Sequence, residues 1–154
     1  MSKNRDPIEI LLVEDNAGDV RLTMEALKDS GFPARVHVAR DGVEAMNYLN
    51  RRPPFTDAAR PDLILLDLNL PRRTGREVLV DIKSTPELRR IPVMILSTSR
   101  SEADVLFSYD NHANCYVQKP MEFDRYFEVV QSIERFWCGV ASLPQSINAQ
   151  GAGS

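Results

Sequence analysis

The stretch LILLDLNLP, residues 63 to 71, places one carboxylate inside an otherwise apolar segment. Leu63 to Leu66 have the pattern of a strand that is covered on both faces, as strands of a parallel sheet are. Asp67 follows directly, and the apolar pattern resumes at Leu68 and Leu70. An aspartate at this place either begins a turn or holds a charge at the strand end for chemistry. The rest of the chain has to decide between these two interpretations.

Strand-like and helix-like segments alternate five times along the chain. The strand-like runs, three of them almost entirely apolar, cover residues 8–14, 35–39, 62–67, 92–97 and 115–119. Segments with the apolar spacing of a helix follow them, at 17–29, 42–50, 75–83, 101–110 and 122–137. This alternation is typical of an α/β domain with a parallel sheet and right-handed crossovers.

Composition excludes several classes of function. The chain has 154 residues and a net charge of -3, which fits one domain and provides no basic surface for nucleic acid. No apolar stretch approaches the roughly 20 residues that span a membrane, and the start, MSKNRDP, lacks the apolar core of a signal peptide. Cys115 and Cys138 have no metal-binding spacing and are interpreted as reduced thiols. We therefore expect a cytoplasmic protein with no membrane or nucleic-acid partner.

Polar side chains stand where the predicted strands end. In a doubly wound sheet, ligands bind outside the carboxyl ends of the strands. The first strand ends in Glu14 and Asp15, the third in Asp67, the fourth in Ser97 and the fifth in Lys119. Clustered carboxylates repel one another unless a cation lies among them, and hard oxygen ligands suit Mg²⁺. Such an acidic site argues against a flavin or dinucleotide phosphate, so the pattern predicts a magnesium site.

Four segments resemble the receiver domain of two-component response regulators: LLVEDN, LLDLNLP followed by Gly75, ILSTS and YVQKP. The resemblance extends over residues 8 to about 137. It implies a flavodoxin-like fold, with a five-stranded parallel sheet of order 2-1-3-4-5 and helices on both faces. It also implies that Asp67 accepts a phosphoryl group from the phosphohistidine of a sensor histidine kinase, with Mg²⁺ as cofactor and Mn²⁺ as its substitute.

The resemblance assigns four residues to the metal. Asp15 and Asp67 are direct ligands, Asn69 supplies its backbone carbonyl, and Glu14 holds the ion mostly through water. The first acid of the pair is Glu where the family more often has Asp. This mild departure leaves the expected chemistry intact.

The resemblance also assigns the residues that contact and sense the phosphoryl group. Ser97 and Lys119 contact its oxygens, Ser97 standing where the family more often has Thr. Ser97 moves toward the group and opens space into which Tyr116 turns, so that these two residues form the switch. Asn69 and Ser99, which neighbour the site, tune how long the phosphorylated state lasts.

The C-terminal segment IERFWCGVASLP (133–144) stays apolar beyond the last predicted helix. It either folds back on its own domain or forms a dimer surface, for which the candidates are Phe136, Trp137, Val140 and Leu143. This segment, the loop 50–61 and STSRSEADV resemble the stand-alone regulators of phytochrome-type histidine kinases, which imply a homodimer through the fourth helix, fifth strand and fifth helix. We predict a receiver domain over residues 1–143, including this extension, and a disordered tail over 144–154.

The sequence thus predicts a single-domain response regulator that is not a classical enzyme. Only 17 residues follow Trp137, so its output is expected to pass through a downstream protein or phosphotransfer partner. One rival is a dehalogenase-like phosphatase, which needs a second aspartate where Asn69 stands. The other is a phosphorylation-independent pseudo-receiver that only binds partners. The intact acids, Ser97 and Lys119 argue against it.

Overall fold

The computed structural model describes residues 7–144. Five parallel strands form one sheet in the order β2-β1-β3-β4-β5. The strands are β1 (Ile8–Val13), β2 (Ala34–Ala39), β3 (Leu63–Leu66), β4 (Val93–Ser97) and β5 (Cys115–Gln118). The helices are α1 (Ala17–Asp29), α2 (Gly42–Leu49), α3 (Gly75–Ser84), α4 (Glu102–Asp110) and α5 (Phe123–Gly139). The predicted fold class and strand order are confirmed.

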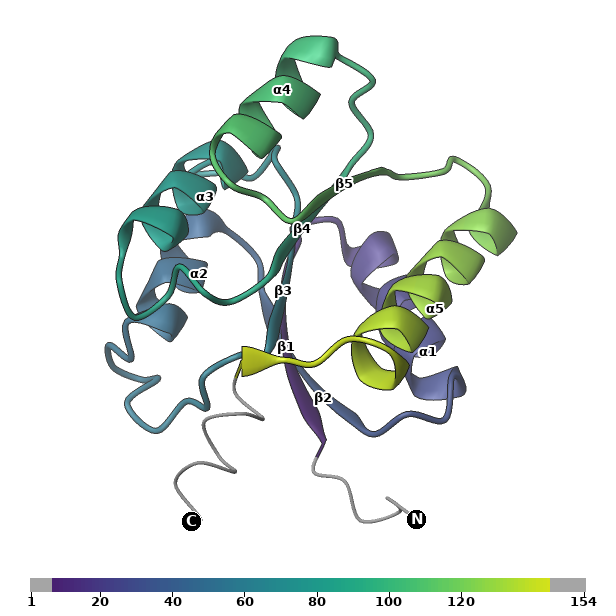
Figure 1. The fold of residues 1–154 in the computed structure, drawn as a ribbon, viewed down its shortest axis with the longest axis horizontal. Coiled ribbons are helices and arrows are strands. Elements are labelled where there is room, and N and C mark those ends of the chain that lie inside the picture. Colours follow the sequence, from purple (N-terminus) through teal and green to yellow (C-terminus); the bar gives the residue numbers. More distant parts are fainter. Residues whose placement is uncertain (1–6, 145–154) are drawn as a thin grey trace.

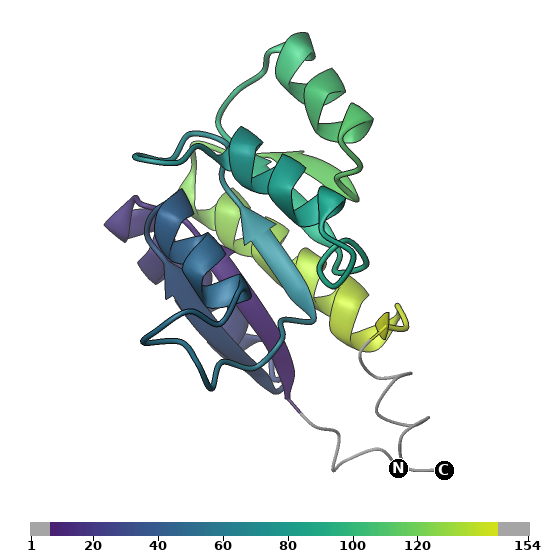
Figure 2. The same cartoon turned by 90° about the vertical axis from the view of Figure 1, so that its left-hand side faces the viewer.

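Helices cover both faces of the sheet. Helices α1 and α5 lie on one face, and α2, α3 and α4 lie on the other (Figure 1). The turned view shows α2, α3 and α4 side by side over their face (Figure 2). Successive strand residues point to opposite faces, so Leu11 and Ile64 pack with α2 and α3, whereas Leu12 and Leu65 pack with α1 and α5. This double cover explains why the central strands are almost entirely apolar.

Backbone pairing continues one residue past the ends of β1, β3 and β5. The amides of Glu14, Asp67 and Lys119 donate to carbonyls of the neighbouring strands over 2.9, 3.1 and 2.7 Å. Because the strands are parallel, these three residues leave the sheet on the same side, which we call the carboxyl edge. The pairing fixes where their side chains begin.

Helix α3 begins against the end of β3. The Gly75 amide donates to the Leu68 carbonyl over 3.0 Å. A Cβ atom at Gly75 would lie 2.0 Å from the carbonyl oxygen of Asp67, so only glycine allows this approach. Thr74 and Glu77 form a capping box that starts the helix. The turn after Asp67 is thereby held in one conformation.

The segment after α5 folds back on its own domain. Leu143 is buried in the core on the α1–α5 side. Trp137 packs partly buried against the same core, and its indole N–H donates to the Met94 sulfur over 2.8 Å. The burial of Leu143 by its own domain contradicts its predicted place on a dimer surface, whereas the part of the half-buried Trp137 in a dimer stays a prediction. Phe136 and Val140 are exposed, and their part in a dimer stays a prediction.

The remaining boundary predictions concern the chain ends. The predicted disordered tail falls on residues 144–154, and all of it except Pro144 lies outside the described residues. Within residues 7–144, no helix is both long enough and apolar enough to cross a membrane.

Candidate functional site

Three carboxylates meet at the carboxyl edge. Glu14, Asp15 and Asp67 each offer one oxygen, and these oxygens all lie within 4.8 Å of one another. Glu14 and Asp67 are buried, whereas Asp15 is exposed to solvent. Carboxylates this close repel one another unless a cation lies among them. Their hard oxygen atoms fit a divalent cation of the Mg²⁺ type, with one open side for water.

The Lys119 ammonium lies among the acids. It donates to Glu14 Oε1, and over 3.1 Å each to Asp67 Oδ2 and Asp19 Oδ2. Lys119 is itself buried, at 6% exposure. Asp19 was not predicted from the sequence, in which it is an ordinary acid in the first turn of a helix. Three of the acids at this edge are therefore bound to one ammonium.

Burial and charge change the proton affinities of this cluster. Burial raises the pKa of Glu14 to about 7, and the hydrogen bond and charge of Lys119 oppose that rise. Burial alone would lower the pKa of Lys119. The Glu14 hydrogen bond and the charges of Asp67 and Glu14 outweigh that effect, so the Lys119 pKa lies above its ordinary value. A positive charge is therefore held beside Asp67.

Both oxygens of Asp67 have a donor. The Asn69 amide donates to Oδ1 over 2.9 Å, and Lys119 donates to Oδ2. These two bonds fix the plane of the carboxylate at the open side of the edge. The roles of Asn69 as a carbonyl ligand and in setting the lifetime stay predictions.

The predicted switch residues lie at the end of β4 and on β5. Ser97 is fully buried, and its Oγ accepts the Ser99 amide over 3.1 Å. The Tyr116 hydroxyl donates to the Ser99 carbonyl over 2.9 Å. The Ser99 hydroxyl donates to Asp104 of α4 over 2.6 Å. Ser97, Ser99 and Tyr116 thus belong to one hydrogen-bond network, while the rotation of Tyr116 stays a prediction.

Comparison with known proteins agrees with this geometry. The family model described as the response regulator receiver domain matches residues 10–131. The chain belongs to the response regulator receiver family. This receiver is 46% identical over 142 residues to response regulator Rcp1 of Synechocystis sp., with 92% of this chain and 97% of that protein covered.

Two solved structures resemble the receiver closely. One is the phosphorylated cyanobacterial phytochrome response regulator RcpA, with a TM-score of 0.88, 52% identity and coverage of 90% and 99% of the two chains. The other is the Mn²⁺-bound form of Rcp1, with a TM-score of 0.87, 48% identity and the same coverage. The likeness to phytochrome regulators is confirmed, and the acidic cluster fits a divalent metal.

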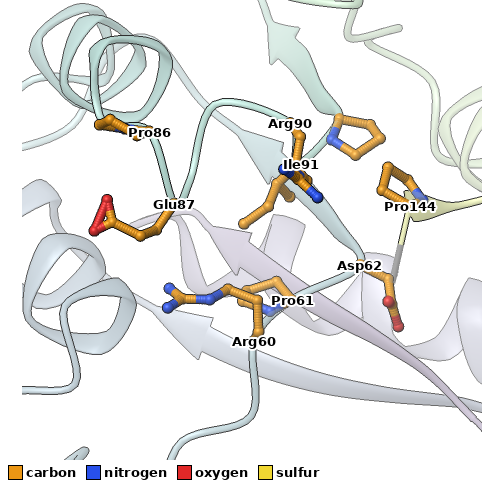
Figure 3. A pocket seen from close by; sticks show the side chains of 9 residues that line it. Arg60, Pro61, Asp62, Pro86, Glu87, Arg90, Ile91 and Pro144 are labelled. Carbon is orange, nitrogen blue, oxygen red and sulfur yellow. The ribbon is translucent and has the colours of Figure 1, made fainter. Parts of the chain in front are cut away.

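A hollow of the receiver lies at the opposite, amino edge of the sheet (Figure 3). It is bounded by the segments that precede β3 and β4 and by Pro144. Arg60 donates to the Leu49 carbonyl over 2.9 Å, and Asp62 accepts the Glu9 amide over 2.8 Å. Arg60 and Asp62 are thus already bound to backbone groups around the hollow. We therefore place the functional site at the carboxyl edge.

Proposed function

We propose that this receiver accepts a phosphoryl group on Asp67 from the phosphohistidine of a sensor histidine kinase. The reaction uses Mg²⁺, for which Mn²⁺ is a substitute. One observation carries the proposal. The Asp67 carboxylate receives hydrogen bonds from Lys119 and Asn69 while lying beside Glu14 and Asp15, whose oxygens complete a divalent-metal cluster.

The residues present suit the transfer step. An Asp67 oxygen forms a bond to phosphorus while the phosphorus–nitrogen bond of the phosphohistidine breaks, and the electron pair of that bond returns to the imidazole. The charge of the moving group is spread over three equatorial oxygens. Lys119 neutralises part of this charge, and the buried Ser97 hydroxyl donates a hydrogen bond to it. A bound divalent cation supplies further neutralisation. The receiver is thus the substrate of its own chemistry and not a classical enzyme.

Intact-mass spectrometry after incubation with acetyl phosphate tests this function. We expect one added phosphoryl group in the presence of Mg²⁺, and none without Mg²⁺ or in the Asp67→Asn variant. The exposed Asp29, on α1, provides a matched control, since Asp29→Asn should be phosphorylated like the wild type. Failure with both acetyl phosphate and a phosphorylated kinase would instead support the phosphorylation-independent binding module.

The kinase that we propose is of the phytochrome type. The similarity to Rcp1, and to RcpA, which is described as a phytochrome response regulator, supports this assignment. The transfer would take place in the cytoplasm, and a downstream protein or phosphotransfer partner would receive the signal. A transfer time course from a phytochrome-type kinase, beside one from a kinase with another sensor, tests the assignment. Equal transfer rates from both kinases would contradict it.

We also propose that the receiver forms a homodimer through α4, β5 and α5. Strand β5 is an edge strand, and large apolar side chains are exposed on the helices beside it. Leu106 of α4 is 61% exposed and Phe123 of α5 is 77% exposed. Exposed apolar groups of this kind often mark a protein contact. Light scattering should show a dimer that Leu106→Asp dissociates and Val80→Asp, an exposed site on α3, does not. A monomeric wild type would refute the proposal.

A further inference from the structure

The loop between β4 and α4 is held through Ser99. Its amide donates to Ser97 Oγ over 3.1 Å, and its carbonyl accepts the Tyr116 hydroxyl over 2.9 Å. Its hydroxyl donates to Asp104 Oδ2 over 2.6 Å and accepts the Ser101 amide over 3.1 Å. Every polar atom of Ser99 is therefore bound, so the position of this residue depends on the groups around it.

Asp104 connects this loop to two helices. It lies in the first turn of α4, and its second oxygen, Oδ1, accepts a hydrogen bond from Arg76 of α3. The hydrogen bonds from Ser99 and Arg76 hold the pKa of Asp104 below its usual range. The carboxylate therefore keeps its charge and both bonds near neutral pH. One side chain thus joins α3 and α4 to the loop that follows Ser97.

We propose that Asp104, held by Arg76, is a positioning residue for the phosphorylation of Asp67. The Ser99 amide occupies an acceptor position of Ser97 Oγ and so directs the Ser97 hydroxyl hydrogen elsewhere. Asp104 determines where that amide lies, because it binds the hydroxyl of the same residue. Groups that stabilise a transferring phosphoryl group act only when they are held in place.

This inference rests on the proposed function, since it concerns the rate of the same transfer. The test measures the rate of phosphorylation by acetyl phosphate at saturating Mg²⁺, by intact mass. We expect Asp104→Ala and Ser99→Ala each to lower the rate about tenfold, as loss of an outer supporting group does. The double variant should be no slower than either single variant, because both changes break the same hydrogen bond.

A second ion pair, between Arg73 just before α3 and Asp81 of α3, provides the control. The two arginines are similarly exposed, at 37% for Arg73 and 35% for Arg76, while Asp81 is 34% and Asp104 17% exposed. Asp81→Ala should therefore leave the rate within about twofold of the wild type. The Mg²⁺ dissociation constant of Asp104→Ala, by calorimetry, should equal that of the wild type, because the metal-binding acids lie on other elements. Asp104→Glu, which keeps the charge, should recover part of the rate.

The outcomes separate the two proposals. If the wild type gains no phosphoryl group, the proposed function fails, whatever the variants do. If the wild type is phosphorylated and Asp104→Ala reacts at the same rate, the positioning role is overturned. It is also overturned if the rate losses of the single variants multiply in the double variant, if Asp81→Ala slows the reaction equally, or if Asp104→Ala weakens Mg²⁺ binding.

Discussion

Glu134 of α5 is a buried acid in an unfavourable place, and its replacement by glutamine should stabilise the protein. The residue is 1% exposed, and among residues 7–144 neither carboxylate oxygen has a hydrogen-bond partner. Burial raises the pKa of Glu134. The neighbouring Ser30 hydroxyl donates to the Leu27 carbonyl over 3.0 Å, so its hydrogen is not available to the carboxylate.

The size and the sign of the effect follow from this burial. A buried polar group without a partner costs about 1–3 kcal/mol, and more when it is charged. In a chain of this size each kcal/mol corresponds to roughly 2–4 °C in Tm. Folding raises the pKa of Glu134, so the contribution of this residue to stability is fully present below its unfolded pKa of about 4.3. That contribution is lost as the pH rises through the folded pKa of Glu134, where the buried carboxyl becomes charged. The advantage of Glu134→Gln is therefore near zero at about pH 4 and greatest above the folded pKa.

Urea denaturation of the wild type and Glu134→Gln across this pH range measures the difference in the free energy of unfolding. Glu128→Gln is the matched control, because Glu128 lies on the same helix and is exposed. Its free energy of unfolding should stay close to that of the wild type at every pH. The reasoning would be refuted by a Glu134→Gln variant that is no more stable than the wild type at about pH 8, or by an advantage that does not change with pH.

Three other substitutions probe the turn after β3, the C-terminal extension and the hydrogen-bond network of the switch residues. Gly75→Ala would place a Cβ atom 2.0 Å from the Asp67 carbonyl oxygen. It should cost about 3 kcal/mol or more in the free energy of unfolding and abolish acceptance of a phosphoryl group, measured by urea denaturation and intact mass. Leu143→Ala should cost about 2–5 kcal/mol in the same denaturation assay and leave the oligomeric state by light scattering unchanged. Tyr116→Phe removes the hydrogen bond to the Ser99 carbonyl. It should cost about 0.5–1.5 kcal/mol, and calorimetry should show the same Mg²⁺ affinity as in the wild type.

The fold and the central part of the site could be predicted because both depend on local patterns. Apolar runs of strand length predict the sheet, and parallel strands bring their carboxyl ends to one edge. The meeting of Glu14, Asp67 and Lys119 therefore follows from where each run ends. These three residues lie far apart in the sequence, but the pairing of the strands is enough to place them together.

Other contacts depend on how the helices dock, which apolar spacing does not determine. Asp19 and Asp104 are ordinary first-turn acids in the sequence, and only the packed helices bring them to Lys119 and Arg76. The C-terminal extension shows the same limit. An apolar segment can cover its own domain or a second copy, and the structure shows the first of these for Leu143, which is buried in the core on the α1–α5 side.

The contacts of Lys119 connect the stability of the site with its chemistry. Its single positive charge lies among Glu14, Asp19 and Asp67, which come from two strand ends and one helix. With Asp15 beside them, the ionised acids outnumber the ammonium, and a divalent cation reduces this excess. A phosphoryl group on Asp67 would bring about two negative charges to the same place. Lys119 then needs only to exchange one carboxylate oxygen for a phosphoryl oxygen, because the other two acids already hold its ammonium within reach.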